Sequence, residues 1–187
     1  MKDGREKPFV ILVSEHCARW ISPMERFLLT SRHSADLIRV SEDELLKSLE
    51  AYSPDAVILP EKQLETAAEI AARGYVAVQI LIDHGADVHL LDACIRAGVL
   101  TGEEKELNLS VVQLLSEASR LRLLHRKTST LQRKLDDARL VSRAKMLLMT
   151  HLQMSEEEAH RYIEKTSMDS GEARRNIAAR IIHTYEE

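Results

Sequence analysis

The residues of this sequence that could perform chemistry are few and scattered. None of the eight histidines has the spacing of a metal-binding motif such as H-E-x-x-H. The neighbours Asp83-His84 have the types of an acid–base pair, but sequence neighbours seldom face each other, so a turn is predicted there. Ser14 lies in no nucleophile elbow, and the six glycines form no phosphate-cradling loop. Cys17 and Cys94 stand far apart, which indicates neither a disulfide framework nor a zinc site. We therefore expect no enzyme activity, no bound metal and no cofactor.

Charged side chains are distributed unevenly along the 187 residues. Residues 1–115 carry 12 Lys and Arg against 19 Asp and Glu, a net charge of −7, whereas residues 116–187 carry 14 against 11, a net charge of +3. Within residues 118–145 the counts are 9 and 2, a net charge of +7. This pattern suggests that only the second half meets a polyanion, although a solvated helix face would give the same counts. Aromatic residues make up only 4% of the chain, which argues against binding by stacked aromatic platforms.

The elements that must position these charges differ between the two halves of the chain. In the first half, continuous apolar runs are typical of strands buried on both faces of a parallel sheet. They occur at Phe9–Val13, Asp36–Val40, Ala56–Leu59, Val76–Ile82 and, more weakly, Val99–Leu100. Helical patterns lie between them at Pro23–Leu29, from Ser41 onward, at Glu61–Ala72 and at Ala86–Ala97, and Ser41 with Glu44 has the pattern of a capping box. We predict an α/β fold with a doubly wound, five-stranded parallel sheet over residues 1–115.

The second half is predicted to be entirely helical. No proline or glycine occurs from about Leu107 to Leu152, which favours one long helix. An apolar seam with alternating three- and four-residue spacing, interrupted by Glu117, predicts a coiled-coil dimerisation helix over residues 116–138. Packing of this stripe on the helix's own domain is the alternative. The seam runs through Leu114, Leu121, Leu124, Thr128, Leu131, Leu135 and Ala138, and we assign dimerisation to Leu121, Leu124, Leu131, Leu135 and Ala138.

Two shorter helices complete a predicted three-helix bundle over residues 139–187. Ser155 should cap the first helix in a capping box with Glu158, and Asp169 or Ser170 should cap the second. The inner faces are predicted from the 3.6-residue period. They comprise Val141, Ala144 and Leu148 of the long helix, Ala159, Tyr162 and Ile163 of the next, and Ala173, Ile177, Ala178, Ile181 and Ile182 of the last.

The order and spacing of residues 135–182 resemble the ANTAR family of RNA-binding antitermination domains. The residues that carry the resemblance are Arg143-Ala144-Lys145, Leu148-Met149, Ser155-Glu156-Glu157-Glu158-Ala159, Ser167-Met168, Ile177-Ala178 and Ile181-Ile182. Two positions depart from the family pattern. Met146 stands where Gly is usual, and Ala138 stands where Arg is frequent.

The resemblance implies binding to paired hairpins in nascent leader mRNA, which prevents a terminator from forming. RNA hairpins are recognised through their loops and backbone, so cations on a rigid scaffold suit this task. Lys145 is the leading contact residue, and the small Ala144 beside it permits close approach. Arg139 and Arg143 share a helix face, but roughly 200° separates Arg143 from Lys145 around the helix. Arg174 and Arg175 could flank the site, and the whole expected RNA-binding set is Arg139, Arg143, Ala144, Lys145, Arg174 and Arg175.

The first half resembles a response-regulator receiver domain that lacks the residues for phosphorylation. Aligning the third apolar run places Pro60, which has no nucleophile, at the position of the phosphoacceptor Asp. The acidic pair that holds Mg²⁺ becomes Ser14-Glu15, which offers one carboxylate. Ile82-Asp83 follows the fourth run in place of Ser or Thr, and Thr101-Gly102-Glu103 follows the fifth in place of Lys-Pro. These departures together predict a pseudo-receiver without a phosphoacceptor.

Taken together, these patterns predict a cytoplasmic, homodimeric antitermination regulator. The pseudo-receiver would serve dimerisation or partner docking, and the family resemblance implies a ligand-sensing regulatory protein as partner. A protein–protein adaptor without RNA binding is the alternative, favoured by Met146 and Ala138. A DNA-binding transcription factor is a weaker one, because the bundle lacks a recognition helix rich in Asn, Gln and Arg at its start. No apolar run approaches the roughly 20 residues that span a bilayer, and the first apolar run is too short for a signal peptide, so no membrane association is expected.

Overall fold

The computed structural model describes residues 7–31, 33–82 and 87–186. The chain divides into two compact units, Met1–His125 and Arg126–Glu187, and each is considered by itself. Asp83 and His84, for which a turn was predicted, lie outside the described residues.

The first unit is built on a five-stranded sheet in which every neighbouring pair of strands is parallel. Its strand order is β2-β1-β3-β4-β5, so the chain reverses its direction of winding between β1 and β3. The predicted doubly wound sheet is therefore confirmed. The strands are β1 (Phe9–Ser14), β2 (Ala35–Val40), β3 (Ala56–Pro60), β4 (Ala77–Ile82) and β5 (Leu100–Glu103).

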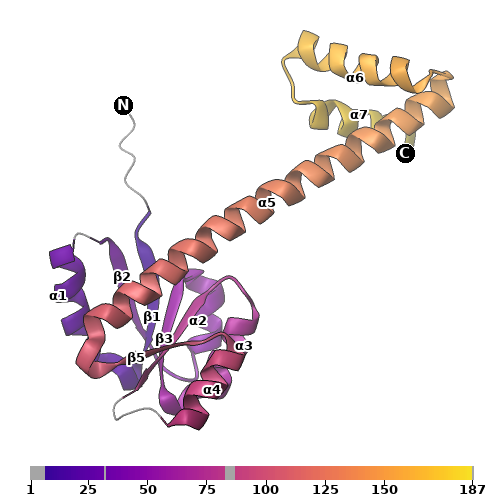
Figure 1. Cartoon of the computed structure of the whole chain (residues 1–187). Helices are drawn as coiled ribbons and strands as arrows, with labels where there is room; N and C mark the ends of the chain where they lie inside the picture. Colours follow the sequence, from indigo (N-terminus) through magenta and orange to yellow (C-terminus); the bar gives the residue numbers. More distant parts are fainter. Residues whose placement is uncertain (1–6, 32, 83–86, 187) are drawn as a thin grey trace. The chain divides into compact units, whose positions relative to one another are not determined.

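Helices cover both faces of this sheet, as Figure 1 shows. The core on one face contains buried side chains of α1 (Ile21–Ser31) and the start of α5 (Leu107–Leu152). The core on the other face contains side chains of α2 (Leu45–Tyr52), α3 (Leu64–Ala72) and α4 (Val88–Ala97). Three short 3-10 segments follow strands, namely η1 (Glu15–Trp20), η2 (Glu61–Gln63) and η3 (Glu104–Glu106).

Helix α2 begins later than its capping pattern predicts. Ser41 was expected to cap the helix, but Glu44 occupies the N-cap and makes no capping hydrogen bond with its side chain. The Ser41 hydroxyl instead donates to the Glu44 carboxylate at 3.3 Å. Helix α4 does have a side-chain cap, because the carboxylate of Asp87 accepts from the His89 N–H at 3.3 Å. Asp87 therefore caps α4, whereas Ser41 lies three residues before the N-cap of α2.

Helix α5 extends over Leu107–Leu152, as predicted from the absence of proline and glycine. Its first turns are part of the first unit's core, where Val111, Leu114, Leu115 and Ala118 are buried. Leu121, which was assigned to dimerisation, is partly buried and packs against the same core.

Arg122 of α5 binds the amino-terminal ends of β1 and β3. Its guanidinium pairs with both carboxylate oxygens of Asp55, one of them at 2.5 Å. It also donates to the backbone carbonyls of Lys7 at 2.9 Å and Pro8 at 2.8 Å. The guanidinium carbon lies 4.2 Å from the centroid of the Phe9 ring, within cation–π distance. Because Arg122 and Asp55 are only 20% and 14% exposed, this charge-assisted cluster is a strong polar attachment of α5 to the sheet.

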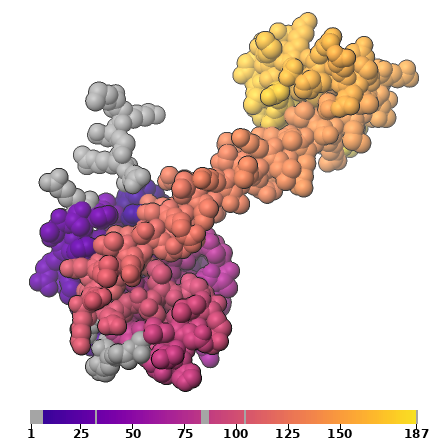
Figure 2. All heavy atoms as spheres, in the orientation of Figure 1, coloured from indigo at the N-terminus to yellow at the C-terminus, as the bar shows by residue number. Residues whose placement is uncertain are grey.

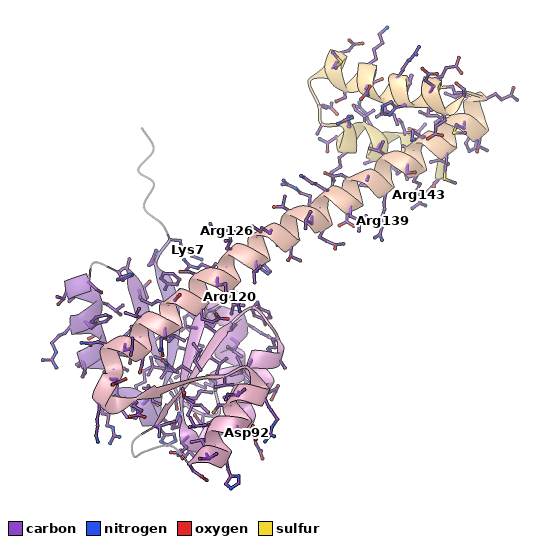
Figure 3. All side chains as sticks on the ribbon, viewed as in Figure 1. Lys7, Asp92, Arg120, Arg126, Arg139 and Arg143 are labelled. Atoms are coloured by element: carbon purple, nitrogen blue, oxygen red, sulfur yellow. The ribbon has the colours of Figure 1, made fainter. Side chains whose placement is uncertain are left out.

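Replacing Arg122 with Ala should lower the free energy of unfolding of the first unit by about 2–4 kcal/mol, because the largely buried Asp55 carboxylate would lose its partner. Urea denaturation followed by circular dichroism would measure the change. Arg120→Ala is the matched control (Figure 3), because Arg120 lies two residues from Arg122, is 61% exposed and pairs with Glu117 of its own helix, so its loss should leave stability nearly unchanged. Equal midpoints for the two variants would contradict the importance of the Arg122 cluster.

Candidate nucleic-acid interface

The second unit is a three-helix bundle formed by the last turns of α5 with α6 (Glu156–Ser170) and α7 (Arg174–Glu186). Each helix contributes an alanine with no exposed surface, so the three backbones can approach closely. The core consists of Ala144, Leu148, Ala159, Ile163, Ile177, Ala178 and Ile181. Most of the predicted inner faces are thereby confirmed. Ala144, which was expected to contact RNA, is part of this core and is corrected to a packing residue.

Helix α6 has the predicted capping box. The Ser155 hydroxyl accepts from the Glu158 N–H, and the Glu158 carboxylate accepts from the Ser155 N–H at 2.8 Å. The Ser155 N–H first, and then the Ser155 hydroxyl, which donates to the same carboxylate at 2.9 Å, hold the pKa of Glu158 below its usual range. The predicted cap of α7 is wrong, because α6 continues through Asp169 and Ser170 until Gly171 ends it with a φ of 69°. A positive φ favours glycine, and the helix stops where glycine occurs.

A groove of about 550 Å³ lies on the surface of this bundle. Its wall on α5 follows one helix face, since the contributing positions are spaced at three, four, seven, eight and eleven residues from the first. Four cations line it, together with one carboxylate, one histidine and small apolar side chains. The lining residues are Lys134, Asp137, Ala138, Val141, Ser142, Lys145, His160, Ala173, Arg174 and Arg175.

Three of the four cations in the groove are ion-paired within the bundle. Lys145 donates to the Glu156 carboxylate at 2.5 Å, and this hydrogen bond keeps the pKa of Glu156 below its usual value. The side chain of Lys145 is only 20% exposed, so its ammonium group is held in one place.

The two arginines at the start of α7 are held in the same way. Arg174 donates to Glu164 at 3.0 Å, and Arg175 donates to Asp137 at 2.7 Å. Exposed pairs of this kind are worth at most about 1 kcal/mol, so a phosphate could displace the carboxylates at small cost. The carboxylates therefore hold the arginines in position but can be exchanged for the phosphates of a polyanion.

The remaining predicted RNA-binding residues lie outside this groove. Arg139 and Arg143 lie one turn apart on the same side of α5 (Figure 3). Arg143 donates to the Glu186 carboxylate at 2.7 Å, and Arg139 lies 3.8 Å from Asp136. The structure thus brings together Lys145, Arg174 and Arg175 and leaves the other two arginines apart, as the 200° offset predicted.

Four groove residues were not singled out as binding residues from the sequence: Lys134, Asp137, Ser142 and His160. The spacing of Lys134, Ser142 and Lys145 on one helix face was a usable signal, because helical positions eight and eleven residues apart share that face. His160 belongs to another helix, so only the packing of α6 against α5 could bring it there. Ala138, assigned to dimerisation, also lines the groove.

Tyr162 points outward, contrary to the expectation that it belongs to the bundle core. It is 44% exposed, whereas its neighbour Ile163 is fully buried. Together with Arg161 and Lys165 it lines a second hollow, of about 420 Å³. The helical period favoured both neighbours as core residues, but the close approach of α6 to α5 leaves room only for Ile163.

The residues that the sequence alignment placed at the phosphorylation positions of a receiver lie at the carboxyl ends of the strands. Strand β3 ends at Pro60, and β1 ends at Ser14, whose side chain is buried. The imidazole of His16 lies 2.9 Å from the Lys62 ammonium and 3.7 Å from the Glu42 carboxylate. His16 therefore contacts both a lysine and a carboxylate at this edge of the sheet. Among the described residues, no group of three or more His, Cys, Asp or Glu is placed to hold a metal ion.

Residues 129–182 match the family model of the ANTAR domain, a range that contains every residue lining the groove. This match covers the carboxyl-terminal part of the chain, so residues 129–182 are similar to an ANTAR domain. In the described part of the chain, no helix is both long enough and apolar enough to cross a bilayer.

The chain is similar to the transcriptional regulatory protein PdtaR from two strains of Mycobacterium tuberculosis, CDC 1551 and H37Rv. Each relative is 26% identical over 151 residues, which cover 75% of this chain and 73% of the relative. A signal receiver domain from Vibrio parahaemolyticus matches at 19% identity and a TM-score of 0.49, covering 63% of this chain and 98% of its own.

Proposed function

We propose that this protein is a transcription antitermination regulator that binds paired hairpins in nascent leader mRNA through its ANTAR domain. The observation that carries the proposal is the groove with four cations on the bundle surface, within residues 129–182. The relatives in Mycobacterium tuberculosis are described as transcriptional regulatory proteins, which agrees with this role. Acting on nascent mRNA would place the protein in the cytoplasm, and no catalytic role is proposed for it.

The groove fits an RNA backbone by charge and by rigidity. Lys134, Lys145, Arg174 and Arg175 come from two helices that pack on a common core, so their spacing is set before RNA arrives. Cations that neutralise phosphates release counterions, which makes such binding sensitive to salt. Arg139 and Arg143 remain proposed contacts for RNA that extends beyond the groove.

Two substitutions test the groove. Lys145→Ala and Arg175→Ala should each weaken binding to a two-hairpin RNA by about 5- to 150-fold, because each removes one charged contact. Electrophoretic mobility shifts at several salt concentrations would measure affinity, and the logarithmic salt dependence should have a slope of about −3 for four phosphate contacts.

Arg180→Ala is the control for these variants. Arg180 is an exposed arginine of the same bundle, paired with Glu172 at 3.3 Å, and it does not line the groove. It should bind RNA as the wild type does. If the wild-type protein prefers no structured RNA over duplex DNA, the antitermination proposal fails, and a protein–protein adaptor takes its place. Met146, which is 64% exposed on the bundle, would then be a candidate contact.

We further propose that the middle of α5 forms a homodimer. Leu124, Leu131 and Leu135 are 45%, 66% and 47% exposed, and they lie on one stripe with heptad spacing. The colour bar of Figure 2 shows this middle part of α5 in orange. Burying leucines of this size between two copies would contribute about 1.5–3 kcal/mol each.

Replacing Leu124 and Leu131 together with Lys should convert the dimer to a monomer, because two charges would face the partner helix. Light scattering over a range of protein concentrations would report the mass. Leu123→Lys is the control, since Leu123 is 53% exposed but lies one position off the stripe and should leave the dimer intact. A wild-type protein that is monomeric at high concentration would refute the proposed dimer interface.

The first unit is proposed to act without phosphorylation, as a dimerisation or docking module for a ligand-sensing regulatory protein. Pro60 offers no nucleophile at the end of β3, and the neighbouring Lys62 and His16 place a cation–imidazole contact at that edge. Incubation with acetyl phosphate and Mg²⁺ should therefore leave the mass of the intact protein unchanged. A stable phosphoryl adduct on any aspartate, detected by mass spectrometry, would contradict this part of the proposal.

A further inference from the structure

The groove contains one acidic side chain among its described lining residues, and this carboxylate has an unusual position for a surface that binds a polyanion. Asp137 projects from α5 among four cations and accepts from Arg175 at 2.7 Å. Its side chain is 39% exposed, so it faces solvent within the groove. A residue whose only role was to hold Arg175 would not need to line the surface that RNA contacts.

An incoming phosphate changes the partners of Asp137. Exposed ion pairs are weak, so Arg175 can turn from the carboxylate to a phosphate at small cost. The Asp137 carboxylate then faces the groove with no cation of its own, and an ionised carboxylate can only accept hydrogen bonds. Unless the ligand supplies a donor, two negative groups lie close together and repel each other.

Unpaired nucleobases supply such donors, because their Watson–Crick edges carry N–H groups that are free in loops. In duplex DNA pairing consumes these donors, and inorganic polyphosphate has no N–H group. The groove also offers Ala138, Val141 and Ala173 as small apolar surface against which a base could lie. Its volume of about 550 Å³ is within the range of small-molecule sites.

We propose that Asp137 is a specificity-determining residue, which accepts a hydrogen bond from an N–H donor of an unpaired RNA base in the groove. The same carboxylate disfavours polyanions that bring phosphates without a donor. Specificity of this kind combines an attractive contact for the correct ligand with a repulsive one for the others. The inference rests on the proposed RNA-binding function and identifies which part of the RNA the groove recognises.

The test compares Asp137→Asn with Asp136→Asn in the full-length protein. Both variants remove one negative charge from adjacent positions of α5, but Asp136 pairs with Arg139 at 3.8 Å and does not line the groove. The RNA probe is the tightest binder selected by the wild-type protein from hairpins with randomised loops. The comparison ligands are duplex DNA of matched length, whose Watson–Crick edges are paired, and inorganic polyphosphate, which has no N–H donor.

Asp137→Asn should weaken binding to the selected hairpin by about 10- to 150-fold, the loss expected for a charge-assisted hydrogen bond. It should also bind duplex DNA and polyphosphate up to about 5-fold more tightly, because a repelling charge is gone. Asp136→Asn should not weaken hairpin binding. Asp137→Glu, which keeps the carboxylate, should restore part of the preference for the hairpin. Unfolding cannot mimic this result, because a damaged bundle would lose affinity for all three ligands.

Three outcomes are distinguishable. The inference is supported if Asp137→Asn binds the hairpin more weakly and polyphosphate more tightly than the wild type, and Asp136→Asn shows neither change. If both asparagine variants bind the hairpin with the same affinity, Asp137 does not recognise an RNA base, and the proposed RNA-binding function stands without this contact. If the wild-type protein binds the selected hairpin no better than duplex DNA, the RNA-binding function fails on the wild type itself, and the inference fails with it.

Discussion

The structure depends on one helix being part of two hydrophobic cores. The first turns of α5 bury Val111 and Leu114 against the sheet, and its last turns bury Ala144 and Leu148 in the bundle. The Arg122 cluster with Asp55 attaches α5 to the end of the sheet. In the middle segment Leu131 and Leu135 are 66% and 47% exposed, and a second copy of the chain is their proposed partner.

The carboxylates of the groove hold its cations in position but leave them available to a ligand. Lys145, Arg174 and Arg175 each have a carboxylate partner, so their side chains are ordered before any ligand binds. Both arginine pairs are exposed, and Glu156 is exposed beside the less accessible Lys145, so the carboxylates can exchange for phosphates. Ordered cations lose less conformational entropy on binding than free ones, so pre-formed weak pairs favour both affinity and selectivity.

The sheet of the first unit is held by cores on both of its faces, to which the apolar strands contribute. Ser14 and Pro60 are the last residues of β1 and β3, and His16 and Lys62 lie just beyond these strands. A fold of this kind does not by itself determine the chemistry at its carboxyl edge, which depends on the particular side chains placed there.

The sequence by itself determined the elements and their class. Buried runs predicted the parallel sheet, the absence of proline and glycine predicted Leu107–Leu152, and Ser155 with Glu158 predicted the start of α6. These are local properties, because strand burial, helix continuity and capping depend on residues a few positions apart. Periodicity failed where two neighbours were both apolar enough for the core, as for Tyr162 and Ile163.

Only the tertiary structure decided which charged residues form a site. Lys145 and Arg175 are 30 positions apart in the sequence, and Asp137 and His160 reach the same groove from different helices. It also packed Leu121 against one core and buried Ala144 in another. The physical reason is that helix packing, set by small buried residues such as Ala144, Ala159 and Ala178, determines which helix faces meet, and no local pattern records that choice.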